Sequence, residues 1–529
     1  MKGPERAASI GALVGALATL PGLGAGTLWD NSETAYGEVA REVLLAHDWI
    51  VMHLNGHPWF IQPPLYFWIA ALFARVLGIS AFAMRLPSAL ATIAMGAVIA
   101  YAVARRAGER AGIFASIVLS TALMQAIIGR LAIMDALLDL FVTIALFAWF
   151  RGLETGDDRP YVLGALALAL GFLAKGPVAP VIALLVVAPY VLWSRRYETL
   201  HPPSRRAWTL GIAAFVVIAS PWLVALAART NIRSVGELIG HYTFGRYTGV
   251  IENQSGPVWY YVPVLILGFF PWIAFLVPAI AYGLDLVRKD SLWRLGFVWM
   301  IAPLLFFSFA ETKLPNYIAL EVPGLAMVTG LYFDAVSRKG ASRSAIVASS
   351  VVPVTIGMLA IAIRLFTLDN RLTADVAAAV PALLGAALAI FLGSLGCTLL
   401  LVRRAAAAAP YALAVAMLAA LDVLAVAVLP YAEAFKPIPR LAAVIDRDRR
   451  SGDVVAIDGV SGSNALVFYT QPGVVIVRRP RAVICSAPRV WLIAPRDAAP
   501  LDPPCGRSHR VIAQAAKASL YLYVPTDLR

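Results

Sequence analysis

Residues 28–64, LWDNSETAYGEVAREVLLAHDWIVMHLNGHPWFIQPP, bring acidic, histidine and aromatic side chains together in one short stretch. Asp30 and Glu33 stand just before an amphipathic pattern at 35–46, which predicts a helix whose N-terminal end would stabilise both carboxylates as anions. The aromatic residues nearby are typical anchors at a membrane–water interface: Trp49, Trp59, Phe60 and Tyr66. Carboxylates held there could act on a substrate that has one end in lipid. A solvated loop outside the membrane is the alternative interpretation.

The composition indicates that these residues belong to a polytopic membrane protein. Of 529 residues, 60% are hydrophobic and only 14% are charged, and the mean hydropathy is +0.76. A soluble chain of this length would not need so much apolar surface. The net charge of +13 has a simple source in basic cytoplasmic loops, so no nucleic-acid partner is expected. Three cysteines are too few for a disulfide framework.

Apolar runs of roughly 17–25 residues predict about 13 membrane-spanning helices. The predicted spans are approximately 8–26, 84–104, 111–129, 135–150, 160–174, 177–193, 208–227, 259–283, 294–310, 316–334, 344–364, 376–402 and 410–430. Segment 64–79 is apolar but short, and its placement decides on which side every later loop lies. If it lies along the interface, the Arg and Lys clusters all fall on one side, which is the cytoplasm by the positive-inside rule.

The opposite, periplasmic side then receives few charged residues, and several of them stand at helix ends. They are Asp30, Glu33, Arg130, Asp135, Lys175, His241, Arg246, Glu311 and Lys313. Ionisable residues at membrane depth are costly and usually mark function. Snorkelling of side chains from helix ends is the alternative, and it suits Arg130 best.

The composition changes after Pro437 and Pro439, and a small α/β domain is expected at 436–529 on the periplasmic side. Residues 441–449 are expected to form a helix. The β-rich runs are 454–457, 465–469, 473–477, 489–494 and 519–524. Cys485 and Cys505 would lie in an oxidising compartment and could pair, although their spacing does not show whether they are close.

Six segments, in chain order, resemble signatures of the GT-C membrane glycosyltransferases. They are residues 28–56, PWFIQPPLYFWIAALFARVLG, GRLAIMDALLD, GFLAKGPVAPV, GPVWYYVPVLILGFFPW and ETKLPNYIALEVPGLAM. The similarity is greatest to the ArnT-like branch, and the protein O-mannosyltransferases (PMT) share the same core. The resemblance implies a GT-C domain at 1–435 with about 13 spans, juxtamembrane helices in a catalytic first periplasmic loop at 27–83, and the periplasmic domain at 436–529.

The resemblance also implies a reaction. A sugar would be transferred with inversion from a polyprenyl-phosphate donor, such as undecaprenyl phosphate, to a lipid, glycan or protein acceptor. The site would be at the periplasmic face of a bacterial inner membrane. A carboxylate would deprotonate the acceptor, and cations would stabilise the departing phosphate.

Residue roles follow from the matched positions. The catalytic candidates are Asp30, Glu33 and Asp135, and the substrate-binding candidates are Tyr36, Arg130, Lys175, Arg246, Lys313 and Tyr317. Three positions depart from the family pattern. Ser32 stands where the family has Asp, Ile61-Gln62 replaces Glu-Lys, and Ala35 replaces Arg. We therefore expect that Asp30 and Glu33 are both needed, with Glu33 near the donor and Asp30 near the acceptor, or that the activity is altered.

A divalent metal ion is a further possibility, and no other cofactor is expected. His53 and His57 are four residues apart, and with His241 and Glu33 they could hold such an ion. Three unrelated loop histidines are the alternative. Two other functions also remain open, a transporter or flippase and a catalytically impaired binder of lipid-linked sugar. A transporter would be expected to show repeat symmetry and charges near mid-bilayer.

Overall fold

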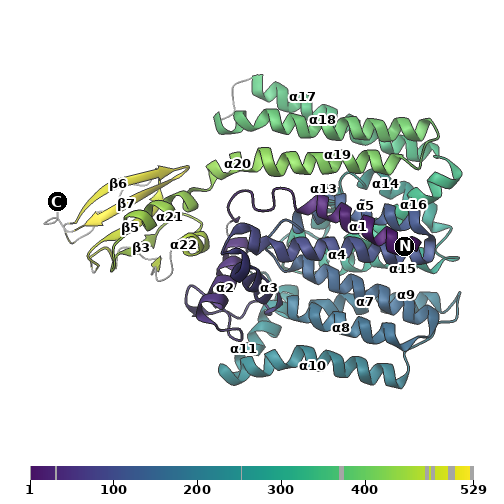
Figure 1. The fold of residues 1–529 in the computed structure, drawn as a ribbon, viewed down its shortest axis with the longest axis horizontal. Coiled ribbons are helices and arrows are strands. Elements are labelled where there is room, and N and C mark those ends of the chain that lie inside the picture. The colour runs from purple at the N-terminus through teal and green to yellow at the C-terminus, as the bar shows by residue number, and fades with distance from the viewer. Residues whose placement is uncertain are drawn as a thin grey trace.

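The computed structural model describes residues 2–29, 32–251, 253–368, 374–470, 476–477, 483–485, 487–497, 505 and 507–524. Within these ranges the side chains of 241–243, 366–368, 374–376, 434 and 476–477 are not described. Long helices lying side by side form a bundle, and a small sheet domain lies beyond one end of it (Figure 1). The N-terminus of the first helix lies at the other end.

The bundle confirms a polytopic helical fold. Its main helices are α1 (Gly3–Thr19), α4 (Ala81–Ala107), α5 (Glu109–Thr121), α7 (Asp135–Thr155), α8 (Asp158–Lys175), α9 (Val178–Ser194), α10 (Arg205–Arg229), α13 (Tyr261–Gly268), α14 (Ile273–Leu284), α15 (Ser291–Ser308), α16 (Val322–Lys339), α17 (Arg343–Leu368), α18 (Ala374–Val402) and α19 (Ala409–Val423). Every predicted span overlaps one helix or a run of two or three consecutive helices. In the described part of the chain, 8 helices are long and apolar enough to cross a membrane, or 9 if the bent pair at 258–284 is one span. The total of about 13 stays a prediction.

Short helices connect and interrupt these spans. They are α6 (Leu123–Ile128), α11 (Ile232–Gly236), η1 (Glu237–Phe244), α12 (Gly245–Thr248), η2 (Val258–Tyr260), η3 (Pro315–Glu321), η4 (Leu424–Val428), α20 (Leu429–Ala432) and η5 (Glu433–Phe435). The helix η3 begins at Pro315, within the KLPNY motif at 313–317, and leads directly into α16.

The loop between α1 and α4 folds into two helices, α2 (Ser32–Ala46) and α3 (Leu65–Leu77), with a small hairpin of β1 (His53–Leu54) and β2 (His57–Pro58) between them. Both helices lie at the end of the bundle that faces the sheet domain (Figure 1). The 13 residues of α3 are too few to cross a bilayer, as expected for segment 64–79. Gly78, with φ of 81°, ends α3 in a conformation that favours glycine.

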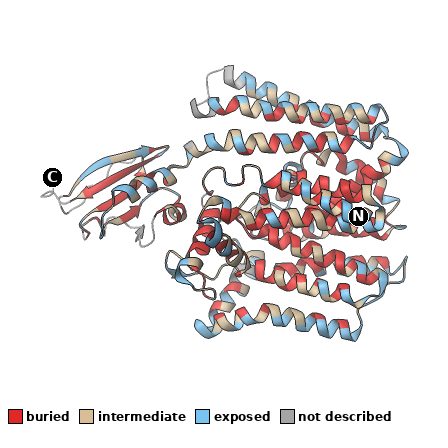
Figure 2. Ribbon diagram, in the orientation of Figure 1, coloured by how far each residue is buried: buried red, intermediate tan, exposed pale blue. Residues whose placement is uncertain are grey.

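Buried residues concentrate in the middle of the bundle, whereas its outer helices expose many side chains (Figure 2). The exposed side chains of the outer helices are largely apolar, for example Val217 and Val224 on α10 and Val351 and Ile361 on α17. Water would disfavour such a surface, and the hydrocarbon core of a membrane favours it.

The C-terminal unit has a five-stranded mixed sheet of order β4-β3-β5-β7-β6. The strands are β3 (Val454–Ile457), β4 (Ile476–Val477), β5 (Val490–Pro495), β6 (Ser508–Ala515) and β7 (Ala518–Val524). β3 pairs in parallel with β4 and β5, and β7 pairs antiparallel with β5 and β6. Helix α21 (Pro437–Asp448) buries Ile438, Leu441 and Ile445 against this sheet, the spacing of an amphipathic helix.

Two details of this unit differ from the sequence-based prediction. Residues 465–469 are not a strand but most of helix α22 (Ser463–Tyr469). Short apolar runs do not distinguish a buried helix from a strand, and here Ala465, Leu466, Val467 and Phe468 are all buried. The other difference is β6, which was not predicted. Of the predicted run 473–477, residues 473–475 lie outside the described part.

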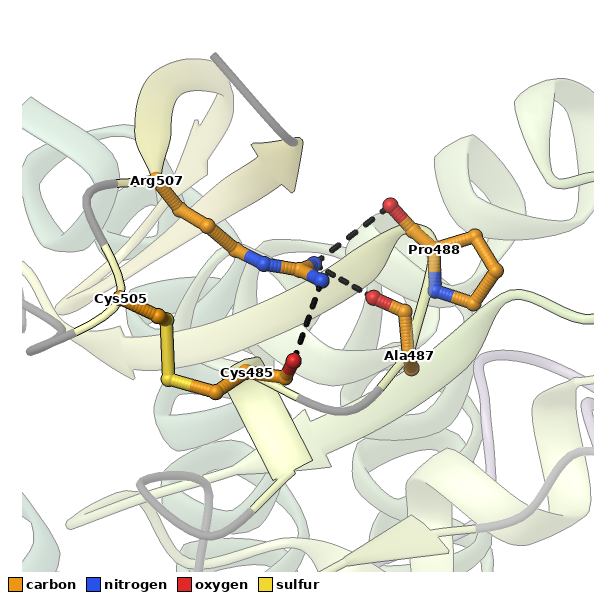
Figure 3. Close-up of a disulfide and its surroundings, with 5 residues drawn as sticks. All are labelled: Cys485, Ala487, Pro488, Cys505 and Arg507. Carbon is orange, nitrogen blue, oxygen red and sulfur yellow. Dashed lines mark hydrogen bonds between the residues drawn. A yellow bond between two sulfur atoms is a disulfide. The ribbon is translucent and has the colours of Figure 1, made fainter. Parts of the chain in front are cut away.

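Cys485 and Cys505 form a disulfide, with a Cα–Cα distance of 5.8 Å. Beside it, the Arg507 guanidinium donates hydrogen bonds to the backbone carbonyls of Cys485, Ala487 and Pro488 (Figure 3). The sequence left this pairing open, and the structure contains it. The disulfide links the segment before β5 to the segment before β6.

Candidate active site

A cavity of about 1310 Å³ opens between α2, α6, α7, η3 and α22. Its polar lining residues are Ser32, Tyr36, Gln62, Asp135, Asp139, Lys175, Arg246, Tyr247, Gln254, Asn316, Tyr317 and Asn464. The rest of its lining is mainly apolar and includes Leu123, Met124, Ile127, Val264, Leu267 and Phe306. A cavity lined by both polar and apolar side chains suits a ligand with a polar head and a hydrocarbon chain.

Asp135 and Lys175 form the central ion pair of the polar side, with 2.6 Å between Lys175 Nζ and Asp135 Oδ1. Asn316 also donates to the same oxygen, at 2.7 Å. Asp135 begins α7, and Lys175 ends α8, so each charge lies at the helix end that favours it. Gly176, with φ of 70°, ends α8 and thereby fixes Lys175 in its last turn.

Tyr317 connects this pair to a second cation. Lys175 Nζ lies 5.3 Å from the centroid of the Tyr317 ring, within the range of a cation–π contact. Arg246 donates from Nη1 to the Tyr317 hydroxyl at 3.3 Å. The structure therefore brings four of the predicted site residues, Asp135, Lys175, Arg246 and Tyr317, to one cavity wall.

Tyr36 faces the same cavity from α2. Its ring makes edge contacts with the rings of Trp59, Tyr66 and Phe67, with centroids 6.0–6.4 Å apart. Such aromatic packing holds the ring in a defined orientation. The hydroxyl of Tyr66 also donates to the backbone carbonyl of Met84 at 2.7 Å, which ties this aromatic cluster to α4.

Glu33, which is expected near the donor, does not line the cavity. Its carboxylate is 2% exposed and pairs with Arg85 through two hydrogen bonds of 2.9 Å. It also accepts the backbone N–H groups of Trp29 at 2.8 Å and Ala132 at 2.6 Å. With both oxygens engaged, Glu33 holds the start of α2 against α4 and against the loop that precedes Asp135, which suits a structural role.

Arg130 and Lys313 also lie outside the cavity lining. Arg130 donates to the backbone carbonyls of Ala18 and Pro21 and pairs with Asp422 at 3.2 Å. Lys313 is buried, and its Nζ donates to the carbonyls of Ser308 and Ala310. Both cations therefore satisfy backbone carbonyl groups. Of the three cations expected to gather around one phosphate, Lys175 and Arg246 line the cavity and Lys313 does not.

The remaining predicted residues are Asp30 and the three histidines. Asp30 lies outside the described residues, and so does the side chain of His241. His53 and His57 stand on opposite strands of the β1–β2 hairpin. No group of three or more His, Cys, Asp or Glu side chains that could hold a metal ion occurs in the part of the chain that the structure describes. The predicted metal set includes His241, so it stays a prediction.

Ser32, Ala35, Ile61 and Gln62, the positions that depart from the family pattern, all line the cavity. The charged residues of its described lining are instead Asp135, Asp139, Lys175 and Arg246, which come from α7, the end of α8 and α12. The side of the cavity formed by α2 and the following loop therefore contributes neutral groups.

Sequence reasoning missed several polar lining residues, among them Asp139, Asn316 and Asn464. Asp139 follows Asp135 by four positions, which places both on one face of a helix, and this spacing is a usable signal. Asn316 lies within the KLPNY motif. Asn464 comes from α22 of the C-terminal unit and is nearly 300 positions away from Lys175 in the sequence. Nothing in its sequence context indicates that it lines the same cavity.

Comparisons with known proteins agree with this layout. Residues 61–224 match the model of the dolichyl-phosphate-mannose-protein mannosyltransferase family. An undecaprenyl phosphate-alpha-4-amino-4-deoxy-L-arabinose arabinosyl transferase of Photorhabdus laumondii is 30% identical over 383 residues, which are 69% of this chain and 66% of the relative. The transferase of the same name from Pseudomonas aeruginosa strain UCBPP-PA14 is 31% identical, over 57% of this chain and 55% of the relative. The chain thus matches little more than half the length of that relative.

Among solved structures, ArnT from Cupriavidus metallidurans bound to undecaprenyl phosphate superposes with a TM-score of 0.81 at 21% identity, over 98% of both chains. The same protein in the apo state gives a TM-score of 0.78 at 19% identity. These matches confirm the GT-C fold. Together, the helical bundle, the sheet domain and the sequence matches show that the chain belongs to the GT-C-fold family of ArnT-like and protein mannosyltransferase (PMT) membrane proteins.

Proposed function

We propose that this protein transfers a sugar, with inversion, from a polyprenyl-phosphate donor to a lipid, glycan or protein acceptor. One observation carries the proposal: Lys175, Arg246 and Asp135 line a single cavity whose remaining lining is mainly apolar. The names of the relatives, which specify an undecaprenyl-phosphate-linked sugar, support this donor class. So does the similar ArnT structure, which is described as bound to undecaprenyl phosphate.

The donor phosphate would lie between Lys175 and Arg246, where charge-assisted hydrogen bonds are strongest. Tyr317 orients both cations toward this place, through its ring and its hydroxyl. The polyprenyl chain would follow the apolar side of the cavity, along Leu123 and Leu267, toward the bilayer.

The chemical step is a single displacement. An acceptor oxygen attacks the anomeric carbon of the sugar, the bond from that carbon to the phosphate oxygen breaks, and the phosphate leaves with the electron pair. The acceptor proton passes to a carboxylate, for which the described residues offer Asp135. Asp30 is a second candidate, from outside the described residues. Preplaced positive charge stabilises the leaving phosphate, which is the part assigned to Lys175 and Arg246.

The reaction would take place at the periplasmic face of a bacterial inner membrane. The sorting of the basic loops supports this orientation, with the cavity, the first loop at 27–83 and the domain at 436–529 on the side opposite the Arg and Lys clusters. The Cys485–Cys505 disulfide suits an oxidising compartment.

Labelling of engineered single cysteines in intact cells tests this orientation: position 460 should react with an impermeant reagent, and positions 200 and 340 should not. Strong labelling at 200 would contradict the orientation.

Transfer itself is tested with the purified full-length protein in detergent or proteoliposomes. Undecaprenyl phosphate linked to 4-amino-4-deoxy-L-arabinose is the first donor to try, with lipid A and total envelope glycolipids as separate acceptors. Mass spectrometry should detect a sugar-modified acceptor whose formation is strongly slowed in Lys175→Ala. It should be unchanged in Lys289→Ala, because Lys289 is an exposed lysine of the predicted cytoplasmic loops. Donor binding without product would favour a catalytically impaired binder. Movement of intact donor across the bilayer would favour a flippase.

A further inference from the structure

Asp139 is a second acid of the cavity, one helical turn from Asp135. Its side chain lines the cavity although the residue is only 2% exposed. Its Oδ2 atom has no hydrogen-bond partner among the described residues. Asp135 differs in this respect, because Lys175 and Asn316 both donate to it.

A carboxyl group in these surroundings is costly. Burial without a hydrogen-bond partner disfavours any polar group, and ionisable residues inside membrane helices are rare unless they serve function. The ion pair next to it does not supply a partner for Asp139, because Lys175 contacts Asp135 and the Tyr317 ring. A ligand in the cavity would supply the missing partner.

The geometry points to the sugar ring of the donor as that partner, so we infer that Asp139 binds a hydrogen-bond donor group on this ring. This inference rests on the proposed function. If the phosphate lies against Lys175, the sugar bonded to it lies within reach of Asp139, since residues four apart on a helix have Cβ atoms about 5–6 Å apart. The group on the sugar is an N–H of an ammonium or an O–H of a hydroxyl, and both can bond to a carboxyl group.

Binding measurements on the purified full-length protein test this inference. Two ligands are compared, undecaprenyl phosphate and the same lipid with a 4-amino-4-deoxy-L-arabinose head. Asp139→Leu should weaken binding of the sugar-bearing lipid about tenfold or more, the cost of losing a hydrogen bond to a charged group. Binding of the bare lipid should stay within about twofold, because its phosphate contacts Lys175 and Arg246.

Thr143→Val is the matched control. Thr143 lies one turn further along α7, is fully buried, and has an unpartnered Oγ1 among the described residues, but it does not line the cavity. This variant should leave both affinities unchanged. Asp139→Leu should also raise the melting temperature of the ligand-free protein, because it removes a buried group that lacks a partner. If Asp139→Leu does not fold, Asp139→Ala takes its place under the same criterion.

Asp139→Asn separates the two kinds of sugar group. Its amide keeps the shape and can accept from a hydroxyl group, but it has no charge for an ammonium. A tenfold loss for the amino sugar assigns the ammonium as the partner, and near-normal binding assigns a hydroxyl. The ratio of the affinities for the two lipids is the decisive quantity. If this ratio is the same in Asp139→Leu as in wild type, the inference is overturned. Failure of the wild-type protein to bind either lipid would instead contradict the proposed function.

Discussion

Glu33 and Arg85 form a buried two-point ion pair that joins the first loop to the helical bundle. Arg85 donates from Nε to Oε1 and from Nη2 to Oε2, each at 2.9 Å, and it also donates to the carbonyls of Leu23, Ala25 and Thr27. The side chains are 5% and 2% exposed. Because the same carboxylate accepts the N–H of Ala132, the pair sets the position of Asp135 without touching the cavity.

The first prediction separates a positioning role of Glu33 from a catalytic one. Glu33→Ala leaves the Arg85 guanidinium buried and unpaired, which should lower the free energy of unfolding by about 3–5 kcal/mol. Glu109→Ala is the control, because its pair with Arg6 is partly exposed and should contribute about 0–1 kcal/mol. Thermal unfolding in detergent measures both. A Glu33→Gln protein of normal stability that has lost transfer would assign Glu33 to the chemistry instead.

The second prediction contrasts Lys175 with Lys313. Lys175→Ala should lower the rate of transfer by about 10²–10³-fold, as expected for removal of a group that stabilises developing negative charge. Lys313→Met should mainly lower stability, since Lys313 Nζ donates to the carbonyls of Ser308 and Ala310. The checks are single-turnover rates and melting temperatures of both variants. Equal rate losses at equal stability would place Lys313 beside the phosphate, the role that the sequence motif suggested.

Hydropathy could predict the helices of this protein because a span must be apolar over its whole length. The same argument could place Asp135 and Lys175 at helix ends on one side. The sequence could not decide the role of Glu33, because a carboxylate at a helix N-terminus can act as a base or form an ion pair. Only the fold brings Arg85 next to this carboxylate. Asn464 is a similar case, since α22 reaches the cavity only after the C-terminal unit has docked.

That docking gives the third prediction. Arg41 on α2 donates to the carbonyls of Val467 and Thr470 at 3.0 and 3.2 Å while it pairs with Glu38. The Tyr469 hydroxyl accepts the N–H of Leu28 at 2.6 Å. Arg41→Ala should therefore release α22, increase hydrogen exchange at 463–470 by at least tenfold, and reduce transfer because Asn464 leaves the cavity.

Tyr469→Phe is the milder partner of Arg41→Ala, because it removes one hydrogen bond, an effect of about 1 kcal/mol. Its exchange rate at 463–470 should lie between those of wild type and Arg41→Ala. Unchanged exchange in both variants would show that other contacts hold α22 on α2.

The last prediction concerns pH and the junction between the membrane part and the sheet domain. Glu433 accepts hydrogen bonds from the N–H and hydroxyl of Thr27 and pairs with Lys436 at 2.8 Å. Burial alone would raise the pKa of Glu433, but the contacts with Lys436 and Thr27 outweigh it and hold the pKa below its ordinary value of 4.5. A carboxyl group whose pKa falls on folding stabilises the native state above its unfolded pKa, and that stabilisation is lost as the pH falls through its folded pKa.

Glu433→Gln keeps the shape of the side chain and removes its charge. At pH 7 this variant should melt at a lower temperature than wild type. Below pH 4.5 the difference should shrink as the pH falls through the lowered pKa of wild-type Glu433, since the neutral side chain then resembles the variant. Other carboxylates titrate equally in both proteins, so the difference between the two melting curves isolates Glu433. A difference that stays constant from pH 7 to pH 3 would mean that the charge of Glu433 does not hold Thr27 and Lys436 in place.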